Sequence, residues 1–174
     1  MNNIAIFCGS KYGSLPIYQA ETEALCIQLA RHNRHIIYGG GNAGLMGTVA
    51  NTVLAHGGTV TGIIPQFLHT QERLHSGVTE LIVTATMHQR KQALFARSSA
   101  AIILPGGYGT LDELFELLTW NQLELHQIKV FIYNINGFYN ALLAHIQQMG
   151  DGGFLYTKDA FVVLEQANDI LPYL

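Results

Sequence analysis

Short apolar runs alternate along the chain with longer segments whose apolar positions recur at helical spacing. The apolar runs predict strands at residues 3–8, 35–38, 59–64, 79–84, 100–104, 130–134 and 161–164. The segments between them predict helices at 16–32, 45–56, 87–98, 110–123 and 137–149, a loop at 66–77 and a final helical turn. Most runs are continuously apolar, which is typical of strands buried on both faces. The pattern therefore predicts an α/β fold, a three-layer, doubly wound parallel sheet of the Rossmann-like type, in a single domain over residues 1–174.

Small and glycine-rich segments follow three of the predicted strands, at 8–10, 39–47 and 105–110. In doubly wound sheets, ligands bind outside the carboxyl ends of the strands, where the strand order reverses. We therefore expect these segments to line one crevice. The candidates in the first two segments are Gly9, Ser10, Gly41 and Asn42. For the 39–47 segment, close packing of a helix on the sheet explains the glycines equally well, and no acidic residue ends the next strand to hold the ribose of a dinucleotide.

The composition favours a folded protein, since 49% of the residues are hydrophobic and only 12% are charged. The low charge also indicates that a partner subunit covers part of the apolar surface. A formal net charge of −3 offers no basic footprint for nucleic acid, and no apolar run approaches the roughly 20 residues that span a membrane. No signal-peptide pattern is visible, so we expect a cytoplasmic protein in which Cys8 and Cys26 are reduced thiols.

The segment 104–113, LPGGYGTLDE, joins a predicted strand to a predicted helix through a glycine turn. The first N–H groups of a helix lack partners and carry the positive end of its dipole, and glycines let an anion approach the backbone closely. We expect a phosphate cradle here, with Thr110 capping the helix and offering its hydroxyl. Its residues are Gly106, Gly107, Tyr108, Gly109 and Thr110. A plain strand-to-helix turn is the alternative, although two glycines would suffice for it.

Two carboxylates, Asp112 and Glu113, stand just inside the helix that the cradle opens. A carboxylate beside a phosphate site indicates chemistry, or recognition of hydroxyls such as those of a ribose. Arg90 and Lys91 lie at the start of another predicted helix, where adjacent cations oppose the dipole. We therefore expect an anionic ligand or the acids at 112–113 to hold them; the alternative is a solvated helix start. Glu116 lies one turn after Glu113 on the same face of the helix. It either supports the site or is a solvent-facing acid.

The sequence indicates neither a metal site nor a cofactor. The eight histidines are scattered, and the two cysteines lack metal or redox spacing. The glycine loops lack a P-loop lysine, and no Gly-x-Ser-x-Gly elbow is present.

Two motifs together resemble those of the LOG ("Lonely guy") family, the cytokinin riboside 5′-monophosphate phosphoribohydrolases. PGGYGTLDE at 105–113 matches the family motif PGGxGTxxE, and MHQRK at 87–91 resembles its second motif. Asp112, where many members carry Glu, and Asn121, where many carry Ala, are mild departures. The name lysine decarboxylase, often attached to such proteins, has no support in these residues. Further family-like positions, which extend the resemblance over nearly the whole chain, lie at 7–10, 38–47, 62–65, 118–123 and 136–139.

The resemblance implies a hydrolase that splits the N-glycosidic bond of a nucleoside 5′-monophosphate into a free base and ribose 5-phosphate. N6-modified adenosine monophosphates, and often AMP, would be its substrates. By the family pattern, Arg90 and Glu113 are the catalytic pair. Substrate contacts come from Glu72, Lys91, Thr119 and the cradle. The resemblance also implies a homodimer that needs no metal or redox cofactor.

The residue chemistry agrees with this activity. Breaking a glycosidic bond builds positive charge on the ribose, and a carboxylate such as Glu113 stabilises that charge more than it stabilises the neutral substrate. Arg90 would hold Glu113 ionised or stabilise charge on the departing base. A carrier that binds a nucleotide or a molybdopterin-type cofactor without reaction is the competing hypothesis. In that case Glu113 only grips ribose hydroxyls.

Overall fold

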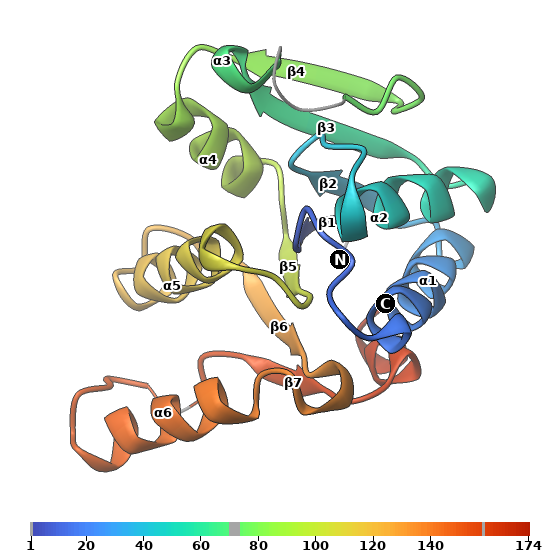
Figure 1. The fold of residues 1–174 in the computed structure, drawn as a ribbon. Helices are drawn as coiled ribbons and strands as arrows, with labels where there is room; N and C mark the ends of the chain where they lie inside the picture. Colours follow the sequence, from blue (N-terminus) through green and yellow to red (C-terminus); the bar gives the residue numbers. More distant parts are fainter. Residues whose placement is uncertain (1, 70–73, 158) are drawn as a thin grey trace.

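The computed structural model describes residues 2–69, 74–157 and 159–174. Its strands are β1 (Asn3–Phe7), β2 (His35–Tyr38), β3 (Val60–Pro65), β4 (Glu80–Thr84), β5 (Ala100–Ile103), β6 (Lys129–Tyr133) and β7 (Val162–Leu164). They form one seven-stranded sheet in the order β4-β3-β2-β1-β5-β6-β7, and every neighbouring pair is parallel (Figure 1). Each strand begins and ends within one residue of its predicted bounds.

Helices cover both faces of this sheet. They are α1 (Pro16–Arg31), α2 (Gly44–Ala55), α3 (Gln66–His69), α4 (Met87–Ala96), α5 (Tyr108–Gln122), α6 (Asn140–Asp151) and the 3-10 segments η1 (Ile135–Gly137) and η2 (Ala167–Tyr173). Helices α1 and α2 pack on one face together with η2, whereas α4, α5 and α6 lie on the other (Figure 1). The predicted three-layer, doubly wound α/β architecture is therefore confirmed.

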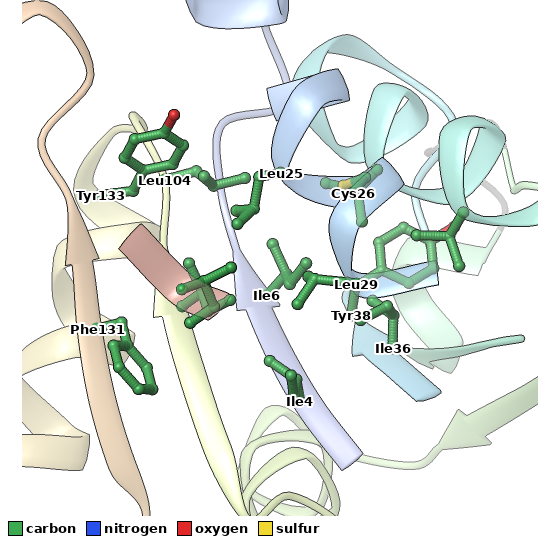
Figure 2. Close-up of a cluster of buried hydrophobic side chains, with 14 of the residues drawn as sticks. Ile4, Ile6, Leu25, Cys26, Leu29, Ile36, Tyr38, Leu104, Phe131 and Tyr133 are labelled. Carbon is green, nitrogen blue, oxygen red and sulfur yellow. The ribbon is translucent and has the colours of Figure 1, made fainter. Parts of the chain in front are cut away.

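Successive residues of a strand point to opposite faces of the sheet, so the strands supply two apolar cores. Ile4 and Ile6 of β1 pack with Leu25 of α1 in the first core (Figure 2). Ala5 and Phe7, the residues between and after them, belong to the second core under α4 and α5. Because both faces are buried, β1 is apolar at nearly every position, which is why its sequence pattern is continuous and not alternating.

The strand order reverses beside β1. From β1 the chain proceeds outward through β2 and β3 to β4, and α4 then carries it back to β5 on the other side of β1. The connections therefore diverge between β1 and β5, and a crevice opens at the carboxyl ends of these strands. The residues that follow β1 and β5 are Cys8 to Ser10 and the expected cradle, and the third expected segment, 39–47, follows the neighbouring strand β2.

The predicted capping role of Thr110 is wrong. Helix α5 begins at Tyr108, and Gly107 is its N-cap with φ −99° and ψ −151°. Thr110 therefore lies within the first turn, where its side chain is buried. The extended backbone at Gly107 turns directly into the helix, which starts two residues earlier than the apolar pattern predicted.

Two other boundaries differ from the prediction. The short helix α3 occupies the start of the expected loop at 66–77. Helix α6 begins at Asn140 instead of 137, because Asn136 and Gly137 have φ values of 50° and 71°, which interrupt a right-handed helix.

Across the described ranges, none of the helices is long and apolar enough to cross a membrane.

Asn121, one of the departures from the family pattern, closes the loop between α5 and β6. Its amide nitrogen donates to the Ile128 carbonyl at 2.7 Å, and its oxygen accepts from the Ile128 N–H at 3.1 Å and pairs with His126 Nδ1 at 2.6 Å. We expect Asn121→Ala to lower the free energy of unfolding by about 1–3 kcal/mol, because a buried backbone pair loses its partner. Urea unfolding measures the change, and an unchanged midpoint would contradict this role.

Candidate active site

The cradle is fastened to the strands on both sides of the crevice. The Leu104 N–H donates to the Phe7 carbonyl at 2.9 Å, and the Gly9 N–H donates to the Pro105 carbonyl at 3.0 Å. Tyr139 completes the attachment, since its hydroxyl donates to the Leu104 carbonyl at 2.7 Å. The loop that follows β5 is thereby held against the loop that follows β1, before any ligand arrives.

Gly106 permits the closest approach within this cradle. A Cβ at this position would overlap the Thr110 side chain and press on the Gly9 backbone. Gly107 and Gly109, in contrast, face open space on their Cβ side. The cradle is therefore tightly packed beneath and open above, as binding of an anion at a helix N-terminus requires.

A hollow of about 370 Å³, here called the central hollow, opens between the cradle and the carboxyl ends of β1 and β2. Its volume falls within the range of small-ligand sites. Residues expected at the site that line it are Gly9, Ser10, Arg90, Gly107, Tyr108, Gly109, Thr110 and Glu113. Its wall also includes Cys8, Gly39 and Met46.

Arg90 and Glu113 meet in this hollow from different helices. Arg90 Nη1 lies 3.3 Å from Glu113 Oε1, and both side chains are largely buried. A second hydrogen bond, from Arg90 Nε to the Ile63 carbonyl at 3.0 Å, fixes the guanidinium over the end of β3. Of the two expectations for Arg90, an anionic ligand or the acids at 112–113, the structure shows the acid Glu113. The arrangement places one cation and one carboxylate side by side above the sheet.

Burial raises the pKa of Glu113 to about 7, and the Asp112 and Glu116 carboxylates raise it as well. The charges of Arg90 and Lys91 act in the opposite direction and lower it. The carboxyl group is consequently poised to gain or lose a proton near neutral pH, as groups that carry out acid–base work often are.

Lys91 pairs with two acids of α5, which precede and follow Glu113 in the sequence. Its amine lies 2.7 Å from Asp112 Oδ2 and 2.7 Å from Glu116 Oε2. Asp112, one of the two acids that were expected to hold the cations of α4, therefore pairs with Lys91, and Glu116 pairs with it as well. Among the described residues, the lining of the central hollow does not include Lys91.

A second hollow of about 330 Å³ adjoins the cradle and shares Gly9, Ser10 and Gly107 with the central hollow. Its walls include three aromatic rings, those of Tyr12, Tyr18 and Phe138, and the last two pack edge to face with centroids 5.6 Å apart. The sequence patterns did not indicate this second hollow, because its walls combine the cradle with the β1–α1 loop, α1, α2 and the segment after η1.

Comparison with known proteins places the chain in a family. A family model described as "Possible lysine decarboxylase" matches residues 46–174. Cytokinin riboside 5′-monophosphate phosphoribohydrolase LOG2 of Arabidopsis thaliana is 39% identical over 165 residues, which cover 95% of this chain and 78% of that protein. LOG3 of the same plant is 43% identical over 152 residues, covering 87% of this chain and 71% of its own length. The chain belongs to the LOG family.

Solved structures extend the likeness of this LOG-family chain beyond its close relatives. A molybdenum cofactor binding protein from Rippkaea orientalis aligns with a TM-score of 0.72 at 18% identity, covering 99% of this chain and 94% of that one. A molybdenum cofactor carrier protein from Chlamydomonas reinhardtii aligns with a TM-score of 0.73 at 17% identity over the same shares of the two chains. At such identities the likeness shows the shared fold alone.

Three of the residues that were expected at the site do not line the central hollow. Gly41 is buried and forms an isolated bridge with Leu74, and Asn42 is exposed. Thr119 is exposed near the end of α5, remote from the cradle along the helix. None of these three is among the described residues that line the central hollow. Glu72 lies outside the described residues.

The 39–47 loop both packs closely against its neighbours and reaches the central hollow. A Cβ on Gly44 would overlap the backbone of Ser10 and Lys11, so this part of the loop packs α2 closely against the β1–α1 loop. Gly39, in contrast, lies at the central hollow, where a Cβ would overlap Arg90 Nη2. Sequence reasoning noticed the glycines but missed this contact, because Arg90 is distant in the chain.

Within the described ranges, no three His, Cys, Asp or Glu side chains are placed to hold a metal ion.

Proposed function

We propose that this protein is a nucleoside 5′-monophosphate phosphoribohydrolase. It hydrolyses the N-glycosidic bond of N6-modified adenosine 5′-monophosphates to release the free base and ribose 5-phosphate, as in cytokinin activation. The observation that carries the proposal is the buried Arg90–Glu113 pair, 3.3 Å apart, in a hollow whose rim is the cradle at the N-terminus of α5. The names of the Arabidopsis thaliana relatives support the same activity.

In this proposal the 5′-phosphate binds at the N-terminus of α5, where the backbone of residues 107–110 lines the hollow. Glu113 follows Thr110 by three residues, so it lies about one helical turn from the phosphate. A ribose joined to that phosphate then reaches Glu113 with its C1′ side. Binding energy gained at the phosphate thereby positions the bond that breaks.

The chemistry follows from the pair. As the bond between C1′ and the base nitrogen lengthens, the ribose gains oxocarbenium character, and the Glu113 carboxylate stabilises it. The carboxylate also orients a water molecule and accepts its proton as the water oxygen bonds to C1′. The base leaves with the electron pair of the broken bond and takes a proton from solvent. The Arg90 guanidinium stabilises the negative charge that grows on the departing base.

We further propose a cytoplasmic homodimer whose reaction needs no cofactor. Leu123 and Leu125, just after α5, leave 59% and 64% of their surface exposed in the single chain. Exposed leucines on a chain with few charges support a surface that a second copy covers.

The carrier hypothesis has less support. The molybdenum-cofactor proteins that share the fold are only 17% and 18% identical, which establishes no common ligand. A carrier also has no need for a buried carboxylate held against an arginine. The two functions differ in product, because a carrier returns its ligand intact.

Incubation of the purified protein with AMP and, separately, with isopentenyladenosine monophosphate tests the proposal. Chromatography measures the free base and ribose 5-phosphate, and the corresponding nucleosides without phosphate serve as controls. We expect isopentenyladenine to be released well above adenine, and little release from the nucleosides. Comparable release from both nucleotides would indicate a general nucleotide N-glycosidase. No release from either, with ligand still bound and unchanged, would overturn the proposal in favour of a carrier.

A further inference from the structure

Lys91 joins the two helices that carry Arg90 and Glu113. Its amine is 2.7 Å from Asp112 Oδ2 and 2.7 Å from Glu116 Oε2, whereas Arg90, the preceding residue, reaches Glu113. Asp112 and Glu116 are four residues apart, so they lie one above the other on α5. The Lys91 and Glu116 side chains are 17% and 20% exposed, whereas that of Asp112 is 59% exposed. Glu116 is therefore the more shielded partner.

The contacts of Lys91 matter because α4 and α5 follow different strands. Helix α4 follows β4 near the edge of the sheet, and α5 follows β5 near its centre (Figure 1). Arg90 faces the central hollow only while α4 lies alongside the first turns of α5. The Lys91 ion pairs connect the same two turns from the adjacent position, outside the lining of the hollow as far as the described residues show.

Among the residues that the structure describes, five ionisable groups interact electrostatically with Glu113. Arg90 and Lys91 face it from α4, Asp112 and Glu116 from α5, and Cys8 from the loop that follows β1. Asp112 and Glu116 would both oppose ionisation of Glu113, because like charges nearby favour the protonated carboxyl group. Lys91 lies against these two acids and offsets their charge at close range.

We propose that Lys91 is a positioning residue, which fastens α4 to α5 and neutralises the acids beside Glu113, and that it does not bind the substrate phosphate. This inference rests on the proposed function. It departs from the role that the family resemblance implied for Lys91, because the amine already has two carboxylates at ion-pair distance.

A pair of isosteric variants tests the inference. Lys91→Met should lower kcat by about 10- to 100-fold with KM nearly unchanged, because the catalytic pair is displaced and Glu113 is harder to ionise. The midpoint of the rise of kcat with pH should move upward. Lys91→Met combined with Glu116→Gln conserves the net charge. It should return the midpoint toward that of the wild type and recover the part of kcat that depends on ionisation of Glu113, whereas the part lost because α4 is no longer fastened to α5 should remain lost. Lys91→Arg, which keeps the charge, should retain most of the activity.

A phosphate ligand would behave differently. Lys91→Met would then raise KM with kcat nearly unchanged, weaken binding of inorganic phosphate at least tenfold, and gain nothing from Glu116→Gln. Any of these three results would overturn the inference. If Lys91→Met does not fold, the double variant still decides: a reduced kcat with KM and the pH midpoint near those of the wild type supports the inference, and a large increase in KM contradicts it.

The test also separates this inference from the proposed function. Wild-type protein that releases no base from either nucleotide contradicts the proposed function. Carbon-13 NMR of the Glu113 carboxyl group reports on Lys91 without turnover. Its pKa should rise in Lys91→Met and return in the double variant, and an unchanged pKa in Lys91→Met would contradict the neutralising role even in an inactive protein.

Discussion

Replacing Glu113 with glutamine will reduce hydrolysis of the nucleotide by at least about 10³-fold in kcat. The amide keeps the shape of the side chain but cannot carry the negative charge that stabilises the ribose in the transition state, and losing one such preorganised group costs about 10²–10³-fold in other enzymes. Here the same side chain also accepts the proton of the attacking water, so the loss is larger. Single-turnover release of the base measures it.

The fold of the Glu113→Gln variant should remain intact, because the substitution conserves volume at a side chain that already lies among polar partners. Circular dichroism and binding of ribose 5-phosphate serve as controls, and both should resemble the wild type. A variant that retained near wild-type turnover would exclude Glu113 from the chemistry and leave only a role in gripping the ribose.

The pH dependence of the wild type provides a companion measurement. Burial raises the pKa of Glu113 from 4.5 to about 7, so kcat should rise as the pH increases through about 7 and the carboxylate forms. The contribution of Glu113 to the free energy of unfolding changes with pH in the opposite direction to kcat. The folded chain binds more protons at this group than the unfolded chain between pH 4.5 and about 7, so this group's contribution to stability falls as pH rises across that window. The Glu113→Gln variant should lack both dependences.

The fold was predictable because its inner strands are buried on both faces. The three fully buried positions of β2, residues 36–38, are all apolar, and this run is visible without any knowledge of its neighbours. Helix starts were harder to predict, since α5 and α6 begin where glycine and asparagine conformations allow, and the apolar pattern does not record those dihedral angles.

The site was predictable only in part. The cradle and the two charge pairs stand out locally, because a pair of cations at a helix start opposes the helix dipole and a pair of acids beside a phosphate cradle would repel the phosphate. The pairing of Lys91 with Glu116, in contrast, depends on how α4 and α5 lie beside each other in space. The positions of Gly41 and Thr119 likewise depend on packing, and a motif match does not reveal whether a residue faces the hollow in the single chain.

Gly39 shows most clearly what packing adds to sequence. It directly follows β2 and lines the central hollow, and Arg90 Nη2 occupies the space that a side chain would fill. Its backbone φ is not in the left-handed region, so alanine is compatible with the backbone conformation. The atom in the way is the far end of a flexible side chain, and the fold should therefore tolerate the methyl group whereas Arg90 must move.

We accordingly expect Gly39→Ala to lower kcat/KM by about 10²-fold while changing the free energy of unfolding by less than about 1 kcal/mol, because a displacement of roughly 1 Å in a catalytic group has an effect of this size. Gly150→Ala in α6 is the matched control, since a Cβ there meets only Leu155 Cδ1 at 3.8 Å, an ordinary contact. It should leave turnover unchanged.

A double-mutant cycle identifies Arg90 as the means by which Gly39 acts. Arg90→Ala alone should nearly abolish turnover, and Gly39→Ala should have little further effect in that background, because the added methyl group no longer displaces a guanidinium. Losses that multiply would show that Gly39 contributes by another route, such as the shape of the hollow beside Met46, which a Cβ would approach to 3.4 Å at the sulfur. Losses that do not multiply would show that the absence of a side chain at Gly39 is what allows Arg90 to lie against Glu113.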